Sequence, residues 1–233
     1  MKQIAIITPV PQIVEMYLNN SILRKAKEKE LVCYHIVDLR EFGIGTYRQV
    51  DDKPFGGGSG MVMMPEPFFN AIKHTFDLIG DKTETQVINP SPQGKHWTHE
   101  TALQHTHDEN LIFICGHYKG IDERVIEKYV THEYSLGDFV VTGGELPVLS
   151  MVDSIIRLIP GVLNNLDSAL TDSFTDGILD FPCYTRPQTI EGLTVPDVLV
   201  GGHHQEIEDW RTQQKKIRTR NRRPDMWEKV NKI

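Results

Sequence analysis

Residues 135–149 read SLGDFVVTGGELPVL, in which an apolar run ends in two adjacent glycines that are followed by an acid. The pattern predicts a strand over residues 138–144 that ends in a glycine turn. A phosphate-binding loop of the form GxxxxGK[ST] places a lysine after its last glycine, whereas Gly144 is followed by Glu145. The turn therefore lacks the composition of a phosphate site.

Short apolar runs alternate with helix-like segments through the first two thirds of the chain. Four further strands are predicted: KQIAIIT (residues 2–8), LVCYHIVDLR (31–40), TQVINPS (85–91) and NLIFICG (110–116). A helix is predicted over residues 13–30. This order is typical of a mostly parallel α/β sheet with flanking helices, to which we assign residues 1–163.

The remainder of the chain has a different composition. Residues 164–180 are rich in Asn, Asp, Ser and Thr and lack sustained periodicity, which indicates an interdomain linker. Segments of this kind are usually either functional or disordered. Residues 181–233 predict a small helical C-terminal domain.

Composition narrows the class of protein. Hydrophobic residues make up 39% of the 233 residues, which is enough for a core without disulfides. Cys33, Cys115 and Cys183 are odd in number and widely spaced, so they indicate a reducing compartment and no zinc site. The first apolar run, Ile4 to Ile7, is too short for a signal peptide or a membrane span. We therefore expect a cytoplasmic protein with no membrane partner.

The formal net charge of −7 conceals a basic tail. Residues 211–233 hold nine Lys or Arg and two acids, whereas the rest of the chain holds 16 basic and 30 acidic residues. A nucleic acid can dock on such a tail. The alternative is a solvated helix face that only balances an acidic protein.

Glycines follow several of the predicted strands. Gly116 follows one, the pair Gly143 and Gly144 follows another, and a third cluster comprises Gly56, Gly57, Gly58 and Gly60. In an open α/β sheet the ligand lies beyond the carboxyl ends of the strands, where glycines let it approach the main chain. We expect these clusters to wall one pocket whose ligand is held by backbone hydrogen bonds and apolar contacts. The alternative is that each cluster only forms a tight turn.

A series of longer motifs resembles a known family. In chain order they are VDDKPFGGGSGM, INPSPQGK, ICGHYKGIDERV, SLGDFVVTGGELP, RLIPGVLNN, DSF, YTRP and WR. Together they extend over essentially the whole chain and resemble the bacterial tRNA (guanine-N1)-methyltransferases, which methylate the guanine immediately 3′ of the anticodon, at position 37. The resemblance implies a SPOUT-class fold with a deep trefoil knot, a homodimer, and tRNA as the partner.

The same resemblance implies S-adenosylmethionine as the cofactor. This cofactor carries no phosphate, which agrees with the absence of a lysine after Gly144. The residues implied to bind it are Pro90, Ser91, Pro92, Gly94, Gly116, Tyr118, Leu136, Gly137, Asp138, Phe139, Val140, Val141, Gly143, Gly144 and Pro147.

Two catalytic residues are implied by the resemblance, Asp172 as the base and Arg157 as a cation near guanine O6. N1 of neutral guanine must lose its proton before it attacks a methyl group, and these residue types suit that chemistry. From the residues alone, Arg157 can instead pair with Asp153 at i, i+4, and Asp172 is one of four acids around the linker. An exposed aspartate, with a pKa of about 3.9, is a weak base, so a closing loop or Mg²⁺ would have to assist it.

A set of substrate-binding residues is also predicted, its first three members from the resemblance and the others from their positive charge. The sequence predicts no metal ligands from the protein. The set is Asp52, Gly58, Met61, Lys119, Arg220, Arg222 and Arg223. Many relatives carry GRYEG where this chain has GHYKG, so His117 replaces an arginine and Lys119 a glutamate. We expect Lys119 either to pair with Asp51, Asp52 or Glu145 or to contact tRNA phosphate.

Two other functions stay open at this point. A catalytically idle RNA-binding protein is one, since Lys119 cannot accept a hydrogen bond from guanine as a glutamate can. A SPOUT methyltransferase that acts on another RNA site is the other.

Overall fold

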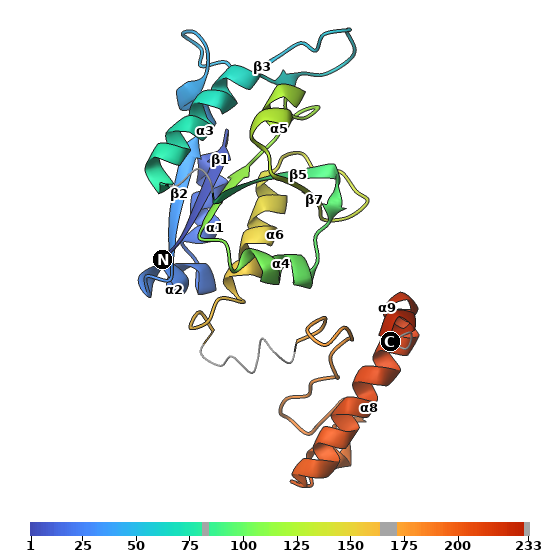
Figure 1. Ribbon diagram of the computed structural model, residues 1–233. Coiled ribbons are helices and arrows are strands. Elements are labelled where there is room, and N and C mark those ends of the chain that lie inside the picture. The colour runs from blue at the N-terminus through green and yellow to red at the C-terminus, as the bar shows by residue number, and fades with distance from the viewer. Residues whose placement is uncertain (81–83, 164–171, 231–233) are drawn as a thin grey trace. The chain divides into compact units, whose positions relative to one another are not determined.

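The computed structural model describes residues 1–80, 84–163 and 172–230. The chain divides into two compact units, Met1–Asn164 and Asn165–Ile233 (Figure 1). Residues 164–171, which make up much of the expected linker, lie outside the described residues.

The first unit is built on a five-stranded parallel sheet. Its strand order is β2-β1-β6-β5-β7, and each neighbouring pair is parallel. The bounds are β1 Lys2–Thr8, β2 Val32–Asp38, β5 Thr85–His96, β6 Asn110–Ile114 and β7 His132–Ser135. The predicted α/β sheet with flanking helices is therefore confirmed.

Helices cover both faces of this sheet (Figure 1). One face carries α1 Pro11–Leu18, α2 Ser21–Glu28, α4 His99–His105 and α6 Glu145–Ile156, and the other carries α3 Pro65–Ile79 and α5 Glu123–Tyr129. Side chains alternate along a strand, so in β1 Ile4 and Ile6 pack on the first face and Ala5 and Ile7 on the second. Burial on both faces explains why these strands read as unbroken apolar runs.

Two predicted elements were wrong in detail. The helix expected over residues 13–30 is two helices, because Ser21 has a φ of 50° and the chain turns between α1 and α2. Residues 138–144 do not form a strand. The fifth strand of the sheet is instead β7, which precedes them in the chain. The apolar side chains that suggested it are exposed, as in Val140 at 86%, because they line a pocket and not the core.

A two-stranded ribbon lies outside the main sheet. Strand β3, Asp51–Asp52, pairs antiparallel with β4, Val62–Met63, and the glycine-rich loop 53–61 joins them. A 3₁₀ turn, η1, Leu39–Phe42, follows β2.

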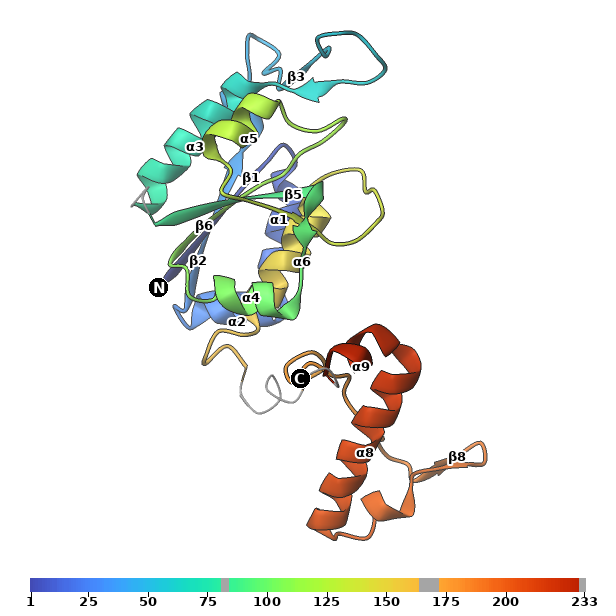
Figure 2. The ribbon, with the colours of Figure 1, turned by 45° about the vertical axis from the view of Figure 1, so that its right-hand side comes forward.

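The second unit contains the expected helices, α8 His204–Arg222 and α9 Pro224–Val230. It also contains a 3₁₀ turn, η2 Asp197–Leu199, and a hairpin of β8 Thr189–Ile190 and β9 Leu193–Thr194 that the sequence did not suggest (Figure 2). The segment before the hairpin packs on α8. Lys215 pairs with Asp176 at 3.2 Å, and the Leu179 amide donates to the buried Thr219 hydroxyl at 2.9 Å.

Among the described helices, none combines the length and the apolar character that crossing a membrane would require.

Candidate active site

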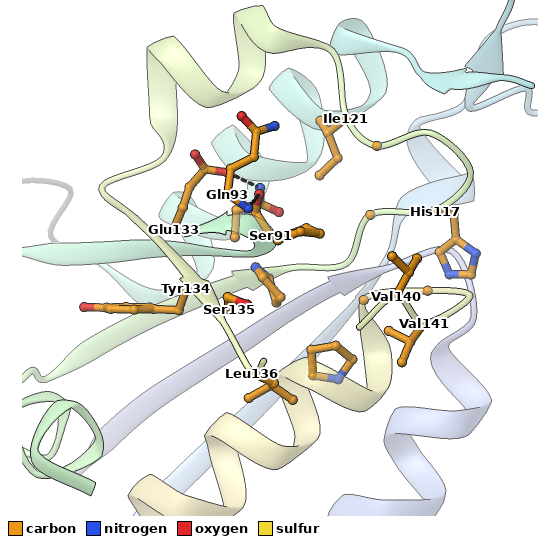
Figure 3. A pocket seen from close by; sticks show the side chains of 18 of the residues that line it. Ser91, Gln93, His117, Ile121, Glu133, Tyr134, Ser135, Leu136, Val140 and Val141 are labelled. Carbon is orange, nitrogen blue, oxygen red and sulfur yellow. Dashed lines mark hydrogen bonds between the residues drawn. The ribbon is translucent and has the colours of Figure 1, made fainter. Parts of the chain in front are cut away.

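Three loops at one edge of the parallel sheet enclose a cavity of about 430 Å³ (Figure 3). They are residues 90–94, where the pairing of β5 with β7 skips from Pro90 to Lys95, residues 116–121 after β6, and residues 136–144 after β7. Because the carboxyl ends of parallel strands meet at one edge, these loops converge although they are far apart in the sequence. The volume lies within the roughly 300–1,000 Å³ of cofactor and small-molecule sites.

Close contact between main chains holds two of these loops together. The amide of Gly144 donates to the carbonyl of Gly116 at 2.8 Å. A Cβ at Gly144 would lie 2.8 Å from the Cys115 Cα and from the Gly116 nitrogen. No larger side chain fits there without a shift of backbone. Glycine is therefore required at position 144 because there is no room for a Cβ, and not because of an unusual backbone conformation.

The third loop meets the sheet in the same way. A Cβ at Gly94 would lie 2.4 Å from the Glu133 carbonyl carbon and from the Tyr134 nitrogen. Gly94 therefore lets the loop after Pro90 return against β7, which closes one wall of the cavity.

The lining of the cavity is part apolar and part polar. In Figure 3, Ser91, Gln93 and Glu133 lie in the upper part of the view, and Leu136 and Val140 lie in the lower part. The carboxylate of Glu133 accepts from the Asn89 amide at 2.9 Å. Among the lining residues Lys119 is the one lysine, and there is no arginine. This composition suits a ligand with apolar and hydrogen-bonding groups and no phosphate.

Most residues predicted to bind the cofactor line this cavity. They are Pro90, Ser91, Pro92, Gly116, Tyr118, Leu136, Gly137, Phe139, Val140, Val141, Gly143, Gly144 and Pro147. Asp138 is not among the lining residues, and Gly94 acts through the main-chain approach described above.

Several lining residues were not predicted. Asn89 immediately precedes a predicted loop, Ile121 and Glu123 follow the motif GHYKG, and Glu133 and Ser135 lie in β7. The short strand β7, HEYS, carries no long apolar run, so no signal in the sequence marked it as a wall of the site.

The predicted substrate residues of the first unit gather near the glycine-rich loop. Met61 accepts a hydrogen bond from the Lys119 amide at 3.1 Å, and the Lys119 side chain passes over Gly60, where a Cβ would meet its Cγ at 3.0 Å. Asp52 is exposed in β3, and Gly58 has a φ of 112° with open space around it. Lys119 is exposed and forms no ion pair with a residue in the described part of the chain, so the expected alternative of a partner among Asp51, Asp52 and Glu145 is not seen.

The two predicted catalytic residues lie in different units. Arg157 is the C-cap of α6, whereas Gly144, the N-cap at the other end of this helix, lines the cavity. Asp172 is half-buried in the second unit. Burial is the larger effect on the pKa of Asp153 and raises it, while Arg157 opposes that shift. Asp153 and Arg157 therefore attract each other, as their i, i+4 spacing suggested. Asp153 is partly buried, whereas the sequence suggested an exposed pair.

The basic residues of the tail that were predicted to bind tRNA lie at the C-terminal end of α8. Arg220 and Arg222 are exposed and form no ion pair with described residues, while Arg223 pairs with Asp225 at 2.7 Å. In the part of the chain that the structure describes, no group of three or more His, Cys, Asp or Glu side chains is arranged to hold a metal ion.

A parallel sheet whose loops wall a pocket at its carboxyl edge, followed by a helical unit, defines an α/β protein with a ligand site at the edge of its sheet. A family model described as tRNA (Guanine-1)-methyltransferase TrmD matches residues 1–229, and the chain belongs to this family.

Similar proteins carry the same description. The chain is 51% identical over 220 residues to a tRNA (guanine-N(1)-)-methyltransferase of Staphylococcus carnosus, covering 94% of this chain and 88% of the relative. It is 50% identical over 224 residues to the protein of that name in Staphylococcus aureus, covering 96% and 89%. A third relative of that name, in Staphylococcus haemolyticus, is 50% identical over 220 residues, covering 94% and 88%.

The close approach at Gly144 leads to a test of the site's architecture. Gly144→Ala should lower the free energy of unfolding by about 1–3 kcal/mol, the usual cost of overpacking a tight contact. Gly201→Ala is the control, because a Cβ there would meet nothing closer than the Asp197 carbonyl oxygen at 3.7 Å. Urea denaturation measures both variants, and equal stabilities would show that the loops are not held by this contact.

Proposed function

We propose that this chain transfers the methyl group of S-adenosylmethionine to N1 of guanine 37 in tRNA. The observation that carries the proposal is the cavity at the carboxyl edge of the sheet, which 13 of the 15 residues implied to bind the cofactor line. Membership of the tRNA (guanine-1)-methyltransferase family supports the reaction.

The residues of the cavity fit S-adenosylmethionine. Apolar side chains such as Leu136, Val140 and Pro147 can pack against an adenine ring. Main-chain groups exposed beside Gly116 and Gly143 can hydrogen-bond the polar edges of the ligand. When bound, the cofactor supplies a methyl group on a positively charged sulfur, which departs as a neutral thioether when a nucleophile takes that methyl group.

Asp172 and Arg157 supply the acid–base chemistry in this proposal. The carboxylate of Asp172 accepts the proton of guanine N1, and the electron pair left on N1 forms the new bond to the methyl carbon. As the proton leaves, negative charge spreads onto O6, and the guanidinium of Arg157 stabilises it.

The position of Arg157 favours a site shared between two copies of the chain. Helix α6 has 12 residues, and at about 1.5 Å per residue its ends lie about 18 Å apart. Arg157 at its C-terminal end therefore does not reach a base bound at the cavity beside its N-terminal end. A homodimer in which one copy supplies the cavity and the other supplies Arg157 and Asp172 removes this difficulty.

Labelled methyl transfer tests the proposed function directly. The protein, S-adenosylmethionine with a labelled methyl group and unmodified tRNA should yield 1-methylguanosine at position 37, identified by digestion to nucleosides and by mapping. Binding of tRNA without transfer would favour the idle RNA-binding protein. Label on another base or position would favour a methyltransferase for a different RNA site.

The exposed side chain of Lys119 predicts a contact with tRNA phosphate. Lys119→Ala should raise the KM for tRNA about 2- to 5-fold, as expected for an exposed charge contact worth up to about 1 kcal/mol. The melting temperature should stay unchanged, because Lys119 forms no ion pair with the described residues. Lys73→Ala, at an exposed position of α3, is the control. An unchanged KM together with a lower melting temperature would contradict the assignment.

The tail predicts a change in salt dependence. Replacing Arg220, Arg222 and Arg223 by Gln should weaken tRNA binding and reduce the slope of log K against log salt concentration by about 2, because fewer counterions are released. Arg223 already pairs with Asp225, so its share should be the smallest. The control replaces Lys25 and Lys27, exposed on α2, by Gln. If both variants keep the wild-type slope, α8 presents only a solvated face.

A further inference from the structure

A buried carboxylate at the start of α6 has no role in the reaction as described. Glu145 is only 4% exposed and is the first residue of the helix. Its Oε1 accepts from the Thr8 hydroxyl at 2.7 Å, and His117 Nε2 lies 2.9 Å from both carboxylate oxygens. A buried carboxylate is costly unless it is hydrogen-bonded, so these two partners account for its presence.

These contacts join three separate segments of the first unit. Thr8 ends β1, His117 belongs to the loop after β6, and Glu145 follows the loop after β7. The two loops also pair directly, since His117 and Gly143 form an antiparallel bridge. A Cβ at Gly143 would lie 2.6 Å from Glu145 Oε2 and 2.7 Å from His117 Nε2, so this glycine leaves the room that the pair occupies.

His117 itself lines the cavity (Figure 3). Its amide donates to the Met63 sulfur at 3.0 Å, which connects the same loop to the ribbon of β3 and β4. Its ring therefore touches the cavity while its hydrogen bonds hold two of the three walls. The buried thiol of Cys115 is adjacent, and burial followed by the charge of Glu145 raises its pKa, so it does not compete as an anion.

We propose that His117 is a positioning residue of the cofactor cavity, whose Nε2–H, held by Glu145, fixes residues 116–121 against residues 136–144 and thereby sets the affinity for S-adenosylmethionine. The choice of this ligand rests on the proposed function, whereas the junction between the two loops does not. A purely structural role would instead make substitution lower the stability of the whole unit without a selective effect on the cavity.

Substitution of His117 distinguishes the two roles. His117→Ala should weaken S-adenosylmethionine binding roughly 10- to 100-fold, as measured by calorimetry, since a hydrogen bond to a buried charge is lost. His117→Arg should restore the affinity to within about threefold of wild type, because a guanidinium can donate to both carboxylate oxygens. His96→Ala is the control, as His96 is exposed at the end of β5.

Hydrogen exchange gives a readout that needs no cofactor. In His117→Ala, peptides that cover residues 116–121 and 136–144 should exchange faster, while those from β1 and β6 should keep their protection. If that variant does not fold, His117→Gln, which keeps one N–H donor, takes its place, and Thr8→Val shows whether the second bond to Glu145 matters as much.

The outcomes separate the inference from the function on which it draws. Wild-type affinity in His117→Ala, an equal loss in the Arg variant, or uniformly faster exchange over the unit would overturn the positioning role. A wild-type protein that binds no S-adenosylmethionine would refute the cofactor and the affinity claim together. In that case, faster hydrogen exchange in His117→Ala that is confined to residues 116–121 and 136–144 would still confirm that His117 holds these two loops together.

Discussion

The site depends on main chains that approach too closely for any side chain to lie between them. At Gly144 the amide reaches the Gly116 carbonyl at 2.8 Å, and at Gly94 the space for a Cβ is filled by the backbone of β7. These two contacts bring three loops around one cavity. Hydrogen bonds between the side chains of His117 and Glu145 add a further link between two of those loops, residues 116–121 and 136–144. Without the close approaches the same residues would form three unrelated turns.

Charge is distributed so that the cavity and the tail have different partners. The cavity carries no arginine and only one lysine among its lining residues, which leaves it suited to a cofactor without phosphate. The basic residues are concentrated instead near the end of α8, where Arg220 and Arg222 are exposed. In our proposal the first region holds the methyl donor, and the second binds the tRNA backbone together with Lys119 of the first.

The sequence predicted the central strands well, for a physical reason. Strands β1 and β6 are buried on both faces, so they appear as unbroken apolar runs. The same signal failed at residues 138–144, where exposed apolar residues such as Val140 line a cavity, and it missed β7, which is short and polar. The local pattern of apolar residues cannot distinguish a side chain that packs in the core from one that lines a ligand cavity.

The site was predictable only in part. Glycine clusters after strands indicated a cavity, and the family motifs indicated most of its lining. The network around Glu145 was not foreseen, because His117 is 28 positions away in the sequence and Thr8 is 137 away. The roles of Asp172 and Arg157 came from the resemblance alone, since a linker acid and a helix-end arginine carry no distinctive pattern.

In the proposed homodimer one copy of the chain supplies the cavity and the other supplies Asp172, and mixing two inactive variants tests this arrangement most directly. One variant is Asp172→Asn, and the other is Val141→Trp, which fills the cavity and is first shown by titration not to bind S-adenosylmethionine. After co-refolding in equal amounts, about half of the dimers are mixed and each mixed dimer has one intact site, so methyl transfer should recover to about a quarter of the wild-type rate. A mixture as inactive as its components would contradict the shared site.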